Sequence, residues 1–215
     1  MTALGVRLTL LAFTVWAACF WVLQRTGTWL PFAFAGVALS FLVVMSGAVP
    51  LSLLRPTRRA LLVGTLGGAA MVVVTHAGYR LVGSMYPGVR SATGELMTLL
   101  YVVGYPDWAR ILLISTIACS EELIFRGLLP SWPGSASLAG ILQTPRLPLL
   151  GILSLFHALA TAPLASALLV GCALVCGIIW GALRFTTGSL AAPILAHVIW
   201  DLGVLLLWPL PTFAA

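Results

Sequence analysis

Charged side chains are scarce in this sequence, and lysine does not occur at all. Only 7% of the 215 residues are charged, whereas a soluble domain carries about 25%. This scarcity excludes an ordinary soluble globular protein. The eleven basic residues are all arginines, and most of them lie at the ends of apolar runs. No basic stripe with interleaved aromatic residues is present, which excludes nucleic-acid binding.

Cysteine is also infrequent, and its placement does not indicate a disulfide-bonded scaffold. All four cysteines fall within apolar runs, where cysteine behaves as a small hydrophobic residue: Cys19, Cys119, Cys172 and Cys176. Nothing beside Cys172 and Cys176 completes a metal site, and the spacing implies no disulfide framework.

Apolar residues dominate the chain, at 61% of the sequence, and the mean hydropathy is +1.11. The pattern predicts an all-α, polytopic transmembrane helix bundle with about seven spans. The predicted spans are 8–23, 29–54, 60–79, 108–129, 147–162, 164–183 and 189–208. The apolar segment 95–105 is too short to span and predicts an interfacial or re-entrant helix. The all-arginine basic set and the Ala, Leu and Gly bias indicate a bacterial protein of the inner (cell) membrane.

Two of the predicted spans carry glycines four residues apart. Gly64 and Gly68 lie in the third span, and Gly177 and Gly181 lie in the sixth. Small residues at this spacing allow the backbones of membrane helices to approach closely. We therefore expect both spans to pack tightly against neighbours.

Two of the five acidic residues stand side by side inside the fourth predicted span. A charge at the bilayer centre costs about 2.5–3.5 kcal/mol on insertion scales, so such residues are functional candidates. Glu122 and Arg126 are spaced i, i+4 with the acid first, which favours an ion pair. Glu121 points to another face of the helix and has no partner within it. The alternative is that both glutamates belong to a purely structural charge cluster.

Polar residues also occur in the fifth and seventh spans. The fifth contains His157, and the seventh contains His197 and Asp201 at a spacing that places both on one helix face. Because such groups cannot face lipid cheaply, they are expected to face the interior of the bundle, near Glu121. An aspartate four residues from a histidine can orient the ring or share its proton.

Three patterns on three predicted spans share this polar character: Glu121-Glu122-x-x-x-Arg126, Leu153-x-x-x-His157 and His197-x-x-x-Asp201. In this order they resemble the CAAX-protease and bacteriocin-processing (CPBP or Abi) family of glutamic-type intramembrane proteases. The second family pattern has Phe where this chain has Leu153, an exchange that keeps an apolar residue one turn before His157. The resemblance covers about residues 107–208. It divides the chain into N-terminal transmembrane helices (1–106) and a catalytic core (107–215) within one membrane domain.

The resemblance implies hydrolysis of a peptide bond in or at the edge of the membrane, without a cofactor. Glu121 and His157 would hold the attacking water, and Glu121 would take its proton. His197 and Asp201 would face the developing oxyanion, or Asp201 would orient His197. Glu122 and Arg126 would fix the helix and the local field. The implied partners are membrane lipid and a peptide or protein substrate with a membrane-embedded or C-terminal segment, such as a sorting segment.

Two other functions use the same residues. Glu121, His157 and His197 could form a zinc site with an open water position, although no His-Glu-x-x-His pattern is present. Alternatively, a transporter or a non-enzymatic binding protein could use intramembrane Glu, His and Asp as a proton relay. Against this second function, the polar residues cluster in one half of the chain, and no inverted repeat is visible.

Overall fold

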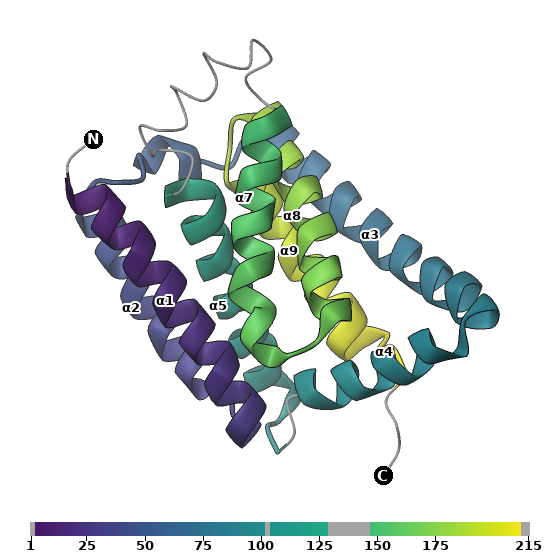
Figure 1. Cartoon of the computed structure of the whole chain (residues 1–215). Helices are drawn as coiled ribbons and strands as arrows, with labels where there is room; N and C mark the ends of the chain where they lie inside the picture. The colour runs from purple at the N-terminus through teal and green to yellow at the C-terminus, as the bar shows by residue number, and fades with distance from the viewer. Residues whose placement is uncertain (1–2, 102–103, 129–146, 212–215) are drawn as a thin grey trace.

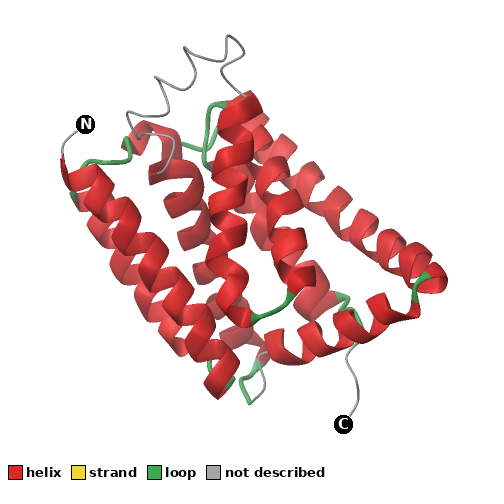
Figure 2. Cartoon of the chain, viewed as in Figure 1, coloured by secondary structure: helices red, strands yellow, loops and turns green. Residues whose placement is uncertain are grey.

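The computed structural model describes residues 3–101, 104–128 and 147–211, and every regular element in these ranges is helical (Figures 1 and 2). The predicted all-α class is therefore confirmed. The α-helices are α1 (Ala3–Thr26), α2 (Leu30–Met45), α3 (Arg58–Met85), α4 (Pro87–Leu100), α5 (Asp107–Glu122), α7 (Leu147–Thr161), α8 (Ala167–Thr187) and α9 (Ala191–Leu202). Shorter segments are η1 (Leu51–Leu54), η2 (Leu123–Leu128), η4 (Ala162–Leu164) and η5 (Gly203–Leu207).

Within the described ranges, three helical stretches are long and apolar enough to cross a membrane: Arg7–Thr26, Arg58–Met85 and Ala167–Thr187. Shorter apolar helices cover Leu30–Met45, Leu150–Leu164 and Ala191–Leu207. Each predicted span coincides with a helix, apart from the boundaries discussed next. The number of spans itself stays a prediction.

The boundaries of two elements differ from the prediction. The second span was predicted over 29–54, but α2 ends at Met45. Gly47 then adopts a left-handed conformation (φ +67°), and a short 3₁₀ segment follows Pro50. The short helix predicted at 95–105 is instead α4, because Pro87 provides a favourable first turn well before residue 95.

The long helices lie roughly side by side, with α1 and α2 paired on one flank and α3 on the other (Figure 1). Helices α5, α7, α8 and α9 lie between the flanks, and α4 crosses one end of the bundle at a steep angle to them. Capping residues determine where several of these helices begin and end. Thr57 caps α3 and Ser166 caps α8 through side-chain hydrogen bonds, and Gly188 ends α8 with φ +69°.

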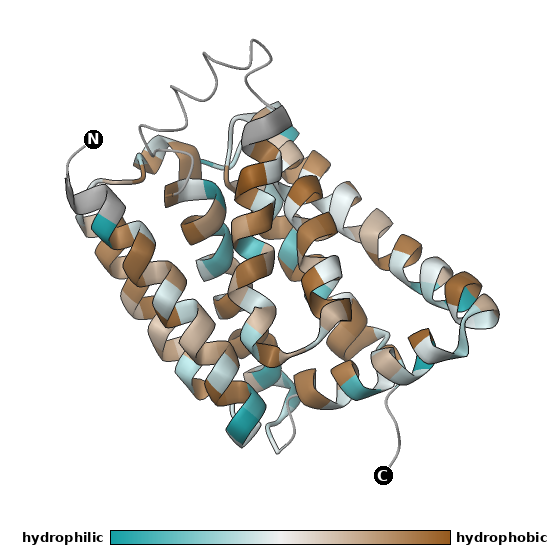
Figure 3. Ribbon diagram, in the orientation of Figure 1, coloured by the Kyte–Doolittle hydropathy of each residue, from teal (hydrophilic) through white to brown (hydrophobic). Residues whose placement is uncertain are grey.

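Much of the outside of the bundle is apolar (Figure 3), and most of the arginines are exposed. Phe34, Leu66 and Val74 are 73%, 69% and 68% exposed, and similar side chains line the outer faces of several helices. Buried side chains, in contrast, include five ionisable groups on α5, α7 and α9 and in η2, namely Glu121, Glu122, Arg126, His157 and His197. The exposed apolar side chains and the buried ionisable cluster suit a bundle surrounded by lipid.

Helix α3 packs directly on α9 through the two predicted glycines. A Cβ atom at Gly64 would lie 2.6 Å from the backbone oxygen of Ala192, and one at Gly68 would lie 2.8 Å from that of Ala196. The second pair acts in the same way between α8 and α7, since a Cβ atom at Gly177 would lie 3.0 Å from Cα of Ser154. The close approach predicted from both glycine pairs is confirmed. This close packing sets the positions of α7 and α9, the helices that carry His157 and His197.

We predict that Gly68→Ala lowers the thermal unfolding midpoint of the purified protein by several degrees. The added methyl group would press on the Ala196 carbonyl and force α3 away from α9, and overpacking of this kind costs about 1–3 kcal/mol. A thiol-reactive dye can follow unfolding, because the four cysteines are buried or half-buried. Gly78→Ala is the matched control on α3, where an added Cβ meets nothing within 4 Å. Equal midpoints for the two variants would contradict the role of Gly68.

Candidate active site

The carboxyl-terminal end of α5 carries the two glutamates, and the helix changes there to the π-helical segment η2. Segments of this kind are frequent at functional sites. Nη1 of Arg126 lies 3.0 Å from Oε1 of Glu122, so the ion pair predicted from their spacing is present. Both side chains are buried, and Glu122 has no exposed surface. The guanidinium also lies over the Trp180 ring, 5.2 Å from its centroid.

Glu121 points to a different face of α5 from Glu122 and meets three other helices. Its Oε1 accepts a hydrogen bond of 2.7 Å from the indole nitrogen of Trp16 on α1. Its Oε2 lies 3.5 Å from Nε2 of His157 on α7 and 3.6 Å from Nε2 of His197 on α9. The carboxylate therefore has no partner within α5, as expected, but it is shared among helices distant in sequence.

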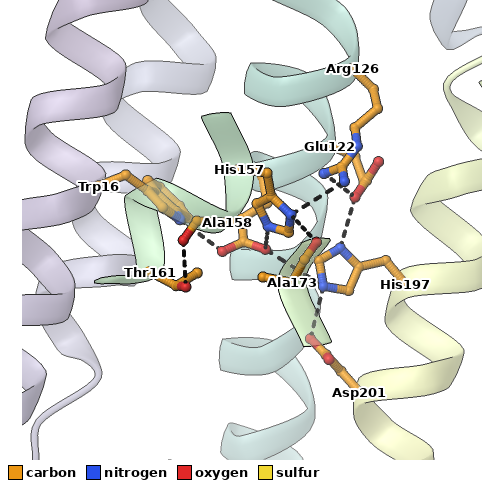
Figure 4. A network of polar contacts seen from close by, with 10 residues as sticks. Trp16, Glu122, Arg126, His157, Ala158, Thr161, Ala173, His197 and Asp201 are labelled. Atoms are coloured by element: carbon orange, nitrogen blue, oxygen red, sulfur yellow. Dashed lines mark hydrogen bonds and ion pairs between the residues drawn. The ribbon is translucent and has the colours of Figure 1, made fainter. Parts of the chain in front are cut away.

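His197 lies among three carboxylates (Figure 4). Its Nδ1 is 2.9 Å from Oε1 of Glu122, and its Nε2 is 3.3 Å from Oδ2 of Asp201. Because carboxylate oxygens only accept hydrogen bonds, the ring satisfies both contacts when each nitrogen carries a proton. The ring is stacked on Trp180 with centroids 3.6 Å apart. A charged imidazole here complements Arg126 in balancing the acidic groups.

His157 is held by α8 as well as by its own helix. Its Nδ1 lies 3.2 Å from the backbone oxygen of Ala173 and 3.4 Å from Nη2 of Arg126 (Figure 4). The carbonyl can only accept, so the shorter contact favours a proton on Nδ1 that is donated to Ala173. In that tautomer Nε2 and Oε2 of Glu121 are both acceptors, so the two atoms can share a donor such as water.

These polar groups border a cavity of about 440 Å³. Glu121, His157, His197 and Asp201 line it at one place, and most of the remaining wall is apolar. Helix α4 contributes one side of the wall with Val89, Thr93, Leu96, Met97 and Leu100. The cavity is large enough for a short segment of polypeptide and suits apolar side chains.

All six predicted site residues come together within this region. Leu153, one turn before His157, is buried in the core as expected. The sequence reasoning missed Trp16 and Trp180, which contact Glu121 and His197. The available signal was weak: a tryptophan deep in an apolar span needs a partner for its N–H group. Among the described residues, no three of His, Cys, Asp and Glu are arranged to hold a metal ion.

The fold and the site define a membrane-embedded helix bundle with an internal cluster of carboxylates and imidazoles. Residues 104–203 match the family described as Rce1-like, type II CAAX prenyl endopeptidase Rce1-like. This region is slightly less than half of the chain and includes all six site residues. The match confirms the resemblance to the CAAX-protease family and indicates a membrane protease, that is, a peptide hydrolase. No curated protein and no solved structure matches the chain.

We predict that Arg126→Ala strongly destabilises the protein. The substitution would leave the fully buried Glu122 without its guanidinium partner, and breaking a buried pair costs about 3–5 kcal/mol. Asp107→Ala is the control, because it breaks the pair with Arg110 where the Asp107 side chain is 78% exposed. That pair should contribute about 1 kcal/mol at most. Thermal unfolding in one detergent compares the variants, and a smaller loss for Arg126→Ala than for the control would contradict the prediction.

Proposed function

We propose that this protein is an intramembrane endopeptidase that hydrolyses a peptide bond of a membrane-associated peptide or of a protein's C-terminal segment. Water activated by Glu121 would be the nucleophile. The observation that carries the proposal is the position of Glu121 Oε2, 3.5 and 3.6 Å from two imidazole nitrogens at the edge of a mostly apolar cavity. Separations of this size are those at which a bridging water becomes relevant.

In the first step the water is held between Glu121 and Nε2 of His157. Glu121 Oε2 takes a proton from it while its oxygen forms a bond to the scissile carbonyl carbon. The carbonyl π electrons move to the oxygen, which becomes an oxyanion. In the second step the C–N bond breaks, and the proton on Glu121 passes to the leaving nitrogen. Attack by water requires no covalent enzyme intermediate.

His197 stabilises the oxyanion in this mechanism. Its Nε2 is adjacent to both Glu121 and Asp201, so a proton on that nitrogen can be donated to an oxygen placed beside the attacking water. Asp201 orients the ring from the cavity side, and Glu122 holds Nδ1 from the opposite side. Arg126 fixes Glu122 and also lies 3.4 Å from Nδ1 of His157, so it acts on the reaction through these two residues.

The cavity wall favours an apolar substrate segment beside the cleaved bond. The family description refers to prenyl endopeptidases, whose substrates carry an apolar lipid. Apolar side chains of a C-terminal sorting segment fit the same wall, and we prefer this substrate because of the bacterial character of the sequence. In both cases the apolar surface supplies binding energy next to a small polar centre.

A zinc-dependent protease is the second candidate, and one observation favours it. Glu121 Oε2 lies 3.5 and 3.6 Å from the Nε2 atoms of His157 and His197, and these are ligand types of a catalytic zinc site, although the three are not arranged to hold a metal ion in this structure. The glutamic mechanism needs no metal, because Glu121 provides the base and His197 provides the donor.

We predict that Glu121→Gln abolishes processing, with a rate loss of about 100-fold or more, because the amide cannot take a proton from water. The measurement compares the termini of membrane and secreted proteins, by mass spectrometry, between cells with the wild-type and the variant protein. Glu95→Gln on the exposed side of α4 is the control and should process normally. An unchanged substrate pattern with a properly inserted Glu121→Gln protein would refute the proposal and favour a binding function.

We also predict that the purified enzyme keeps its activity in EDTA and in 1,10-phenanthroline. The proposed base is a carboxylate, and no step uses a metal. Loss of activity in both chelators, with recovery on addition of zinc, would establish the second candidate instead. Recovery with zinc but not with magnesium would identify a site of nitrogen-ligand type.

A further inference from the structure

Trp16 lies on α1, far outside the region that matches the protease family. Its side chain has no exposed surface, and its indole N–H donates a hydrogen bond of 2.7 Å to Oε1 of Glu121. The two residues are 105 positions apart in the sequence. Hydrogen bonds to an ionised acceptor are shorter and stronger than neutral ones, and this contact has the length of such a bond.

The bond distinguishes the two oxygens of the carboxylate. Oε1 is occupied by Trp16, whereas Oε2 faces the two imidazole nitrogens. Rotation about the terminal torsion of a glutamate is otherwise broad and roughly two-fold, so the carboxylate plane would not be fixed by its own helix. We propose that Trp16 is a positioning residue that fixes the Glu121 carboxylate so that Oε2 alone takes the proton from water. This inference rests on the proposed function of Glu121.

The N-terminal helices hold the indole in place. Trp16 packs edge-to-face on Phe32 of α2, with ring centroids 5.3 Å apart and planes at 76°. Gly36, one turn further along α2, lets that helix approach closely. A Cβ atom there would lie 2.7 Å from Oγ of Ser120 and 3.4 Å from the Trp16 ring. Helices α1 and α2 thus pack directly behind Glu121. Residues that position this carboxylate therefore lie outside the matched region 104–203 as well as within it.

Trp29 provides a matched control within the same aromatic cluster. It also packs on Phe32, with centroids 5.6 Å apart, and it is also buried. Its indole nitrogen, however, has no hydrogen-bond partner among the described residues. Replacing either tryptophan by phenylalanine removes similar volume from the cluster, but only Trp16→Phe removes a hydrogen bond to Glu121.

The test measures kcat and KM separately for the full-length protein in detergent. The probe is an internally quenched peptide that spans the cleavage site found by the comparison of protein termini. For Trp16→Phe we expect kcat to fall about 10–100-fold, as for the loss of a hydrogen-bond partner that orients a metal ligand, with KM unchanged within about twofold. Trp29→Phe should keep kcat within about twofold of the wild-type value; because Trp29 also lines the cavity, only its kcat serves as the control.

Equal kcat values for the two variants, or a change in KM alone, would overturn the inference. If Trp16→Phe does not fold, benzothienylalanine at position 16 decides, because it keeps the shape of the side chain and lacks only the N–H group. A wild-type kcat for that protein would also overturn the inference. The proposed function fails separately: it is refuted when Glu121→Gln stays active, whatever the result at position 16.

Discussion

One carboxylate oxygen, Oε1 of Glu122, ties two helices of the site together. It accepts from Arg126 on the continuation of α5 and from His197 on α9. A buried carboxylate is costly unless it is paired and hydrogen-bonded, so these two contacts must persist wherever the helices pack. The positions of the His197 ring and of its second nitrogen follow from this constraint. Asp201 and Glu121 then meet that nitrogen from the cavity side.

Close backbone packing brings the charges within reach of one another. Glycines on α3 let it lie against α9, and glycines on α8 let it lie against α7. Side chains of ordinary size at these positions would move the two histidines away from Glu121. Residues 3–101 therefore take part in the geometry of the site, although the family match begins only at residue 104. The aromatic cluster around Phe32, on the flank formed by α1 and α2, likewise links the N-terminal helices to the geometry of the site.

Sequence reasoning was reliable where local periodicity or scarcity of charge determines the outcome. With so few charged residues, those inside apolar runs had to meet, and helical spacing alone placed Arg126 beside Glu122 and Asp201 beside His197. Element boundaries were less reliable. Hydropathy continues past Met45, but the left-handed conformation at Gly47 ends α2, and hydropathy averages cannot detect a change in backbone conformation.

The sequence by itself determined the helical class, the ion pair within the fourth apolar run and the set of polar residues that had to face inward. These follow from the cost of charge in lipid and from the period of the helix. Only the tertiary structure decided that Trp16 binds one oxygen of Glu121, that Trp180 lies under His197, and that α4 closes one side of the cavity. Contacts between residues about a hundred positions apart depend on how helices are placed against each other, and no local pattern encodes that placement.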